Sequence, residues 1–178
     1  SLVLETEFET ESGAIRVIDF MTPRRAEPDL VRIVEGIRGE VTVEMELVIR
    51  FDYGWIVPWM QRVGDHLEAV GGPDALSLWT PVETRGEGLT THATFTVREG
   101  ERVPFVLMWY PSHEPAPPPP CDALEALEET TTWWREWVSR CTYKGRWRDQ
   151  VVRSLITLKA LTYAPTHGVV AAVTTSLP

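Results

Sequence analysis

Residues 41–51 read VTVEMELVIRF, and apolar side chains alternate with mostly polar ones along the whole segment. The apolar set comprises Val41, Val43, Met45, Leu47, Ile49 and Phe51. Successive side chains of a β-strand point to opposite faces of a sheet, so this period of two predicts a strand with one buried and one mostly solvated face. Glu44 and Glu46 fall on the solvated face, roughly 7 Å apart at the usual rise per residue.

Similar patterns extend to both sides of this strand. Residues 1–9 alternate in the same way, and a turn at Glu11-Ser12-Gly13 precedes residues 14–21, which predicts a β-hairpin. A turn at residues 38–40 is expected to end the preceding strand. Many antiparallel strands without intervening helices favour a β-sandwich over residues 1–110. The other predicted strands are 30–37, 66–70, 75–79, 91–97 and 103–110.

Prolines crowd residues 111–121, including an unbroken run at 117–120. Such a run favours an extended, polyproline-like path with few backbone donors. We interpret it as a linker between the sandwich and a helical segment. A ligand for a proline-binding domain of the SH3 type is the alternative.

Two helices are expected after this linker. Asp122 and Glu125 have the spacing of a capping box at the start of the first helix. Residues 147–163 repeat apolar side chains at helical spacing, and Pro165 ends this second helix, so a loop follows at 166–168. The chain is therefore predicted to be mainly β with a C-terminal α part. The apolar stripe of the first helix comprises Leu124, Leu127, Thr131, Trp134, Val138 and Cys141.

The bulk composition limits the partners of the chain. Its formal net charge is −9 and its basic residues are scattered, which argues against a nucleic-acid partner. No apolar run approaches the ~20 residues that cross a bilayer, so no membrane association is expected. Cys121 and Cys141 would lie at opposite ends of the first helix, roughly 30 Å apart, which is too far for a disulfide. Reduced thiols suit a reducing compartment, and we expect a cytoplasmic protein.

The order of these elements and several of their sequences resemble glycoside hydrolase family 15, which contains glucoamylases and trehalase-like enzymes. The resemblance rests on LVLETEFET, RVIDFMTPR, DLVRIVEG, RFDYG, ERVPFVLMWYPSHEP and a long segment from LEETTTWW to LKALTYAPT. It implies a supersandwich-like N-terminal β-sandwich over residues 1–110, a Pro-rich linker over 111–121, and the start of a truncated (α/α)6 barrel over 122–178. It also implies that further strands of the sandwich precede Ser1.

The resemblance implies an activity for the intact enzyme but not for this chain. Family 15 enzymes are inverting α-glucoside hydrolases that use one glutamic acid as general acid and one glutamate to activate water. Both glutamates are expected beyond Pro178, so no catalytic residue is expected here and the isolated chain is expected to be inactive. The implied substrate is an α-glucoside, either trehalose or a malto- or isomalto-oligosaccharide. The family usually has Gly where this chain has His167, and Pro where it has Val173.

Few residues qualify as a binding or catalytic site. Trp55 and Trp59 in RFDYGWIVPW could stack on a sugar ring, although a loop that caps the core would use the same residues. His167 lies in a loop that the resemblance places near the substrate mouth, and an exposed loop histidine is the alternative. Glu44 and Glu46 mimic the ~6.5–9.5 Å separation of an inverting pair, but we interpret them as part of a solvated sheet face. The histidines and cysteines lack metal-ligand spacing, and no cofactor motif is present.

Two functions of other classes stay open from the residues alone. A carbohydrate-binding sandwich without a catalytic role would bind oligosaccharides through Trp55 or Trp59. A scaffold or assembly domain would self-associate through the apolar surface of the two helices, and a homo-oligomer is compatible with that surface.

Overall fold

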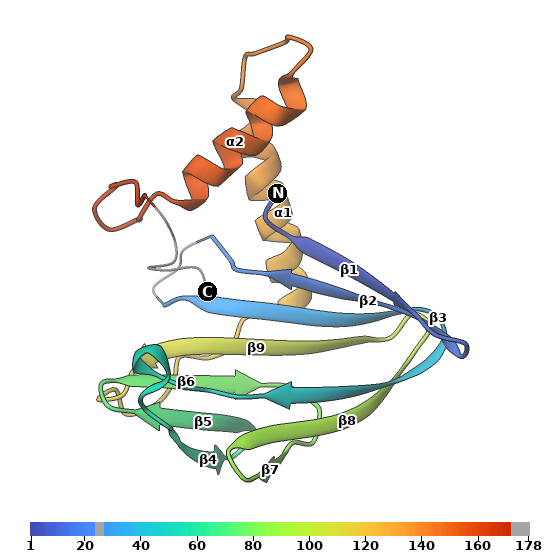
Figure 1. Cartoon of the computed structure of the whole chain (residues 1–178), viewed down its shortest axis with the longest axis vertical. Helices are drawn as coiled ribbons and strands as arrows, with labels where there is room; N and C mark the ends of the chain where they lie inside the picture. Colours follow the sequence, from blue (N-terminus) through green and yellow to red (C-terminus); the bar gives the residue numbers. More distant parts are fainter. Residues whose placement is uncertain (24–26, 172–178) are drawn as a thin grey trace.

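The computed structural model of the chain describes residues 1–23 and 27–171. Strands occupy most of the first part and two α-helices the last part, with one short 3-10 helix between β3 and β4 (Figure 1). The elements are β1 Leu4–Glu9, β2 Gly13–Phe20, β3 Asp29–Leu47, η1 Asp52–Gly54, β4 Trp59–Val63, β5 His66–Gly71, β6 Asp74–Trp79, β7 Arg85–Glu87, β8 Thr90–Arg98, β9 Arg102–Pro111, α1 Ala123–Ser139 and α2 Arg148–Ala160.

The strands form two antiparallel layers that share β3. The larger layer has the order β1-β2-β3-β9-β6-β5-β4, and the smaller one consists of the second half of β3 with β8 and β7. Residues 29–35 of β3 pair with β9, whereas residues 40–47 pair with β8. Two strands predicted as separate are thus one strand of 19 residues, and the turn predicted at 38–40 is wrong. Two further strands, β4 and β7, were not predicted.

Glycines explain how β3 continues where a turn was expected. Gly39 adopts a left-handed φ of 64°, which bends the strand without reversing it. A Cβ atom on Gly36 would lie 1.9 Å from the carbonyl oxygen of Arg98, so the backbones approach too closely there for any side chain. The amide of Gly36 donates to the carbonyl of Glu101, and the amide of Gly100 donates to the carbonyl of Gly36. This close contact joins the two layers at one end of the sandwich.

The β-sandwich prediction is confirmed by the core between the two layers. Val43, Met45 and Leu47 pack toward this core from the smaller layer, while Glu44 and Glu46 are exposed on its outer face, as the alternation predicted. Because both layers contribute side chains, neither can bury its apolar face alone. The buried residues of this core are Ile15, Val34, Val41, Leu78, Val97 and Phe105.

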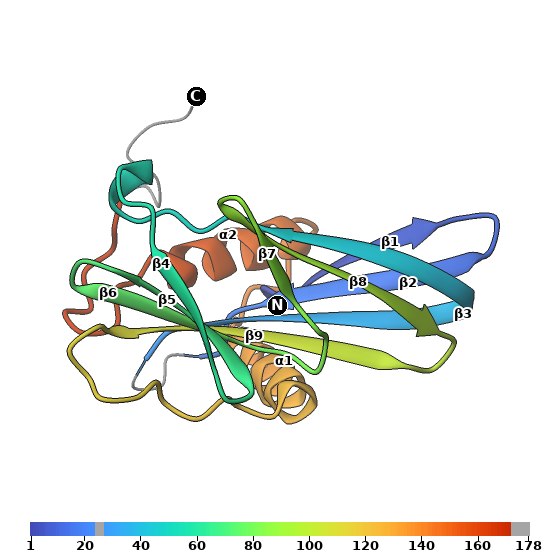
Figure 2. The ribbon, with the colours of Figure 1, turned by 90° about the horizontal axis from the view of Figure 1, so that it is seen from below.

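A second core lies on the opposite face of the larger layer, where α1 packs. Figure 2 shows α1 on one side of this sheet and β7 and β8 on the other. Small side chains at Ala123 and Ala126 let the helix approach the sheet closely. The buried residues of this core are Ile18, Phe20, Val31, Ile33, Val106, Met108, Ala123 and Ala126.

The predicted apolar stripe of α1 is confirmed only in part, because Trp134 is buried and Leu127 is half-buried against this core, whereas Leu124 is exposed. The buried residues of the helix are Ala123, Ala126, Thr130 and Trp134, whereas Leu124 is 41% exposed. The helix is rotated relative to the predicted stripe, so that small side chains lie nearest the sheet and Leu127 packs at the side of the contact. The prediction of Asp122 as the N-cap is confirmed, since Asp122 Oδ1 accepts from the amides of Leu124 and Glu125 at 2.9 Å.

β1 and α2 bury little surface. Every residue of β1 is exposed, including Leu4 at 61% and Phe8 at 51%, so the predicted buried face of this strand is wrong. β1 pairs with β2 alone at the edge of the larger layer. In α2 only Ile156 is buried, and Leu158 is 54% exposed. None of the helices in the described parts of the chain is long and apolar enough to cross a membrane.

Candidate functional site

The segment that connects β3 to β4 is a closed turn with outward-facing aromatic residues. Residues 51–59 are called the aromatic loop below. Within this loop Phe51 and Ile56 form an isolated antiparallel β-bridge, in which the amide of each residue donates to the carbonyl of the other, at 3.0 and 3.1 Å. The Phe51 ring packs directly on the backbone of Gly71, where an added Cβ would meet Phe51 Cδ2. The ends of the loop are therefore fixed to the larger layer.

The backbone inside this loop is strained. Asp52 and Tyr53 have φ values of 48° and 54°, a region that side chains other than glycine enter rarely. Each such residue costs about 1–3 kcal/mol, and such strain clusters at functional sites. Gly54, with a φ of 96°, continues the turn without this cost.

The side chains that this loop presents are large and solvent-exposed. The exposed fractions are 84% for Tyr53, 86% for Trp55 and 69% for Trp59. The alternative in which Trp55 and Trp59 cap the core is therefore wrong. Trp59 is the first residue of β4, and its partner across the sheet is Val70. Of the predicted pair, Trp55 therefore lies in the turn and Trp59 lies in the strand β4.

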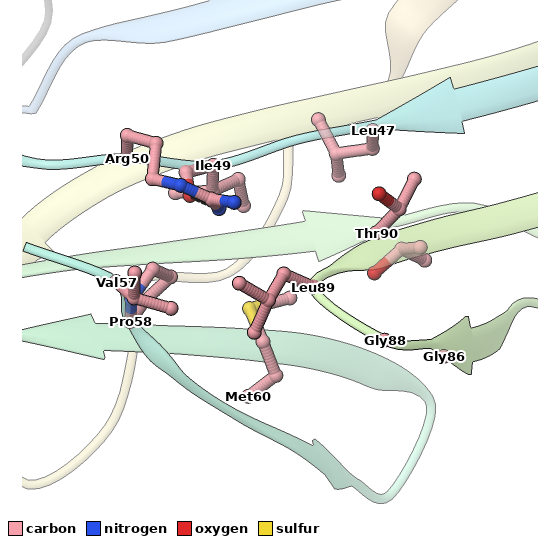
Figure 3. A pocket seen from close by; sticks show the side chains of 11 residues that line it. Leu47, Ile49, Arg50, Val57, Pro58, Met60, Gly86, Gly88, Leu89 and Thr90 are labelled. Atoms are coloured by element: carbon pink, nitrogen blue, oxygen red, sulfur yellow. Dashed lines mark hydrogen bonds between the residues drawn. The ribbon is translucent and has the colours of Figure 1, made fainter. Parts of the chain in front are cut away.

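A small hollow lies beside the aromatic loop, between the ends of the two layers. Figure 3 shows Arg50 and Leu47 on one side of it, with Pro58, Leu89 and Met60 opposite. Its volume is about 200 Å³, below the ~300–1,000 Å³ of typical ligand pockets. The hollow is too small for a disaccharide. One of the residues that line it, Arg50, lies directly before the aromatic loop.

The third candidate, His167, lies in a second closed loop. The amide of His167 donates to the carbonyl of Tyr163, and the amide of Tyr163 donates to the carbonyl of Gly168, both at 2.8 Å. His167 is exposed and has a φ of 58°, the conformation that glycine adopts most easily. This geometry explains why a glycine suits the position in the resembling family. Val173 lies outside the described residues.

The two loops lie toward the same side of the molecule but at well-separated heights in both Figure 1 and Figure 2. Figure 1 and Figure 2 both place residues 161–170, drawn in red, and the short helix η1, drawn in teal, toward the left. Trp55 and Trp59 thus belong to one loop, whereas His167 belongs to another.

A buried polar network was missed because its members lie far apart in the sequence. Glu68 accepts hydrogen bonds from Gln61 Nε2 at 2.8 Å and from the Tyr110 hydroxyl at 3.1 Å. Its other close partner is His66 Nε2, at 3.3 Å, and the His66 ring stacks on Trp79 with centroids 4.2 Å apart. The sequence feature that could have indicated this network is Glu68, an acidic residue between apolar residues in the strand HLEAVG.

This network shifts the pKa values of two of its members. Burial acts to raise the pKa of Glu68, but hydrogen bonds from Gln61, His66 and Tyr110 outweigh it, so the pKa lies below its usual value. Burial and the bond to Glu68 raise the pKa of Tyr110 to about 12. Because Glu68 and His66 are 8% and 7% exposed, they stabilise the sheet rather than meet a substrate.

A larger hollow lies where α1 and α2 meet the end of β2. It measures about 660 Å³ and is lined by Trp133 and Trp134 of α1 and by Lys159 of α2. The Lys159 ammonium lies 5.9 Å from the centre of the Trp133 ring. In the described parts of the chain, no three His, Cys, Asp or Glu side chains are placed to hold a metal ion.

Comparison with known proteins identifies sequence relatives of this chain. The chain is 32% identical over 206 aligned residues to proteins named trehalase from Mycobacterium tuberculosis and Mycolicibacterium smegmatis, which covers 100% of this chain and 30% of each relative. A trehalase of Thermoplasma acidophilum is 30% identical over 181 residues, covering 99% of the chain and 31% of that protein. No family model matches.

Among solved structures, a putative kojibiose phosphorylase from the human microbiome matches with a TM-score of 0.42 and 9% identity, over 89% of this chain and 23% of that one. The sequence relatives are the more informative, because two mycobacterial and one archaeal trehalase align with essentially the whole chain. The chain is therefore similar in sequence to one part of these trehalases, and it spans about 30% of the length of the relatives that it matches.

Proposed function

We propose that this chain is the non-catalytic N-terminal portion of an inverting α-glucoside hydrolase of the glucoamylase and trehalase type, glycoside hydrolase family 15. The observation that supports it is the alignment of the whole chain with about 30% of several trehalases. In this proposal residues 1–110 form the sandwich, residues 111–121 the linker, and residues 122–178 the beginning of the catalytic barrel. The catalytic glutamates belong to the remaining part of the intact enzyme.

The exposed apolar surface of the helical part supports a role in packing against a catalytic domain. α1 is fixed to the larger layer, whereas α2 buries Ile156 alone among its residues. Exposed apolar residues follow along α2 and the loop after it, and such patches mark interaction sites. They include Leu158 at 54%, Tyr163 at 51%, Val169 at 60% and Val170 at 42%.

The substrate follows from the relatives rather than from a site in this chain. Trehalose is the first choice, because the relatives are named trehalase. A malto- or isomalto-oligosaccharide is the second choice, since the resemblance to family 15 includes glucoamylases. We expect the 178-residue chain alone to release no glucose from either class of substrate.

A chimera tests this function directly. The matching segment of the Mycobacterium tuberculosis trehalase is replaced by this chain, and glucose release from trehalose is measured. We expect an active chimera, an inactive protein when the segment is simply deleted, and no turnover by the 178-residue chain. A chimera that folds, as judged by circular dichroism, but does not hydrolyse trehalose would contradict the proposal, as would turnover by the isolated chain.

A further inference from the structure

We propose that the aromatic loop, residues 51–59, is a carbohydrate-binding surface that stacks α-linked glucose rings on Trp55 and Trp59. The binding site is inferred from the loop itself, and only the choice of α-glucosides as the ligand class rests on the proposed function. No residue of this surface takes part in the chemistry of hydrolysis.

The exposure of the rings is the first argument. A buried Trp or Tyr removes about 150–250 Å² from water, which is among the largest gains available to a single residue. The chain uses this gain elsewhere, since Trp134 is only 6% exposed. Tyr53 and Trp55, at 84% and 86%, obtain almost none of it. Aromatic side chains left so exposed within one short loop mark an interaction site.

The backbone of the loop is the second argument. Two non-glycine residues, Asp52 and Tyr53, are held in the left-handed region. The backbone hydrogen bonds between Phe51 and Ile56 hold this conformation at the base of the turn. The hydrogen bond from the Trp55 amide to the Asp52 carbonyl, at 3.1 Å, closes the turn. Strain that the surrounding structure maintains is a feature of functional sites. The turn therefore fixes the backbone at Trp55 before any ligand arrives, which lowers the entropic cost of binding.

The chemistry of the surface favours a sugar. The C–H faces of a pyranose are flat and weakly polar, and they match an exposed aromatic ring, while the sugar hydroxyls need hydrogen-bonding groups nearby. Arg50 precedes the loop directly, and its guanidinium lines the adjacent hollow together with Thr90 (Figure 3). A second copy of the chain fits less well, because two molecules of net charge −9 repel each other.

The experiment uses the 178-residue chain labelled with 5-fluorotryptophan, because fluorine resonances report each of its eight Trp residues separately. Trp55→Phe and Trp59→Phe variants assign two of the resonances. Trehalose and maltotriose are then titrated. We expect the Trp55 and Trp59 resonances to move in a saturable way. In Trp55→Ala or Trp59→Ala the binding of the sugar should weaken about tenfold or more, equivalent to about 1.4 kcal/mol.

Trp147 provides the matched control, since it is 51% exposed but lies at the start of α2. Its resonance should stay in place, and Trp147→Ala should leave sugar affinity unchanged. Unmoved Trp55 and Trp59 resonances at the solubility limit of the sugar would overturn the proposal, as would equal movement at Trp147. If Trp55→Ala and Trp59→Ala instead lower only the melting temperature of the trehalase chimera, the loop contacts the catalytic domain and the proposal is wrong. Sugar binding with an inactive chimera would refute the proposed function alone.

Discussion

Replacing Gly36 with alanine should separate the two layers of the sandwich where they are joined. The new Cβ would lie 1.9 Å from the Arg98 carbonyl oxygen and 2.5 Å from its carbonyl carbon. To reach a distance of 3.0 Å the Arg98 oxygen would have to withdraw by 3.0 − 1.9 = 1.1 Å. The obstacle is backbone, held by the hydrogen bonds of Gly36 with Gly100 and Glu101, so no side chain can rotate away. We expect a loss of about 3 kcal/mol in the free energy of unfolding, the upper part of the range for overpacked sites.

Urea unfolding followed by Trp fluorescence measures this loss. With an m value of ~2 kcal/mol per molar urea, a loss of about 3 kcal/mol lowers the midpoint by about 1.5 M. Gly86→Ala is the matched control, because an added Cβ meets nothing within 4 Å and the residue lies in the exposed strand β7. This control should be neutral or stabilise by up to about 1 kcal/mol. A Gly36→Ala midpoint within ~0.3 M of the original would refute the backbone contact as the joint between the layers.

Two further changes test buried groups. The pKa of Tyr110 is raised from 10.0 to about 12, so the stability that its neutral hydroxyl contributes is complete below pH 10 and is lost as the pH rises toward 12. Between pH 9 and 11.5 the free energy of unfolding of the original chain should therefore fall by about 2 kcal/mol more than that of Tyr110→Phe. Equal losses in both proteins would show that Tyr110 ionises normally. Thr130 is 0% exposed and its hydroxyl has no hydrogen-bond partner among the described residues, so Thr130→Val should raise the free energy of unfolding by about 1 kcal/mol, while the exposed control Thr132→Val should not. Destabilisation by Thr130→Val would indicate a partner for that hydroxyl.

The alternation of side chains predicted most strands of this fold correctly, because a half-buried strand has a simple period. It predicted which faces of residues 41–47 are buried, and the capping signal at Asp122 predicted where α1 begins. It failed at residues 38–40, where glycine in a turn and glycine in a bent strand look the same in sequence. It also missed the buried small residues of α1, such as Ala126, because the closeness of the helix to the sheet selects them and periodicity carries no information about that distance.

The candidate site was predictable only in part. Trp55 and Trp59 were visible as an aromatic pair beside glycine and proline, but their exposure depends on the turn at Asp52 and Tyr53, which sequence patterns do not specify. The network around Glu68 was not predictable, because Gln61 and Tyr110 reach it only after β4, β5, β6 and β9 have aligned.

The continuity of β3 constrains how this fold can change during evolution. A single residue inserted between positions 36 and 40 would turn the second half of the strand over, exposing Val41 and Val43 and burying Glu44. Insertions and deletions among homologues should therefore be absent from this strand and frequent in connections such as the proline-rich segment. We therefore expect homologues to share the length of β3 even where its amino acids differ.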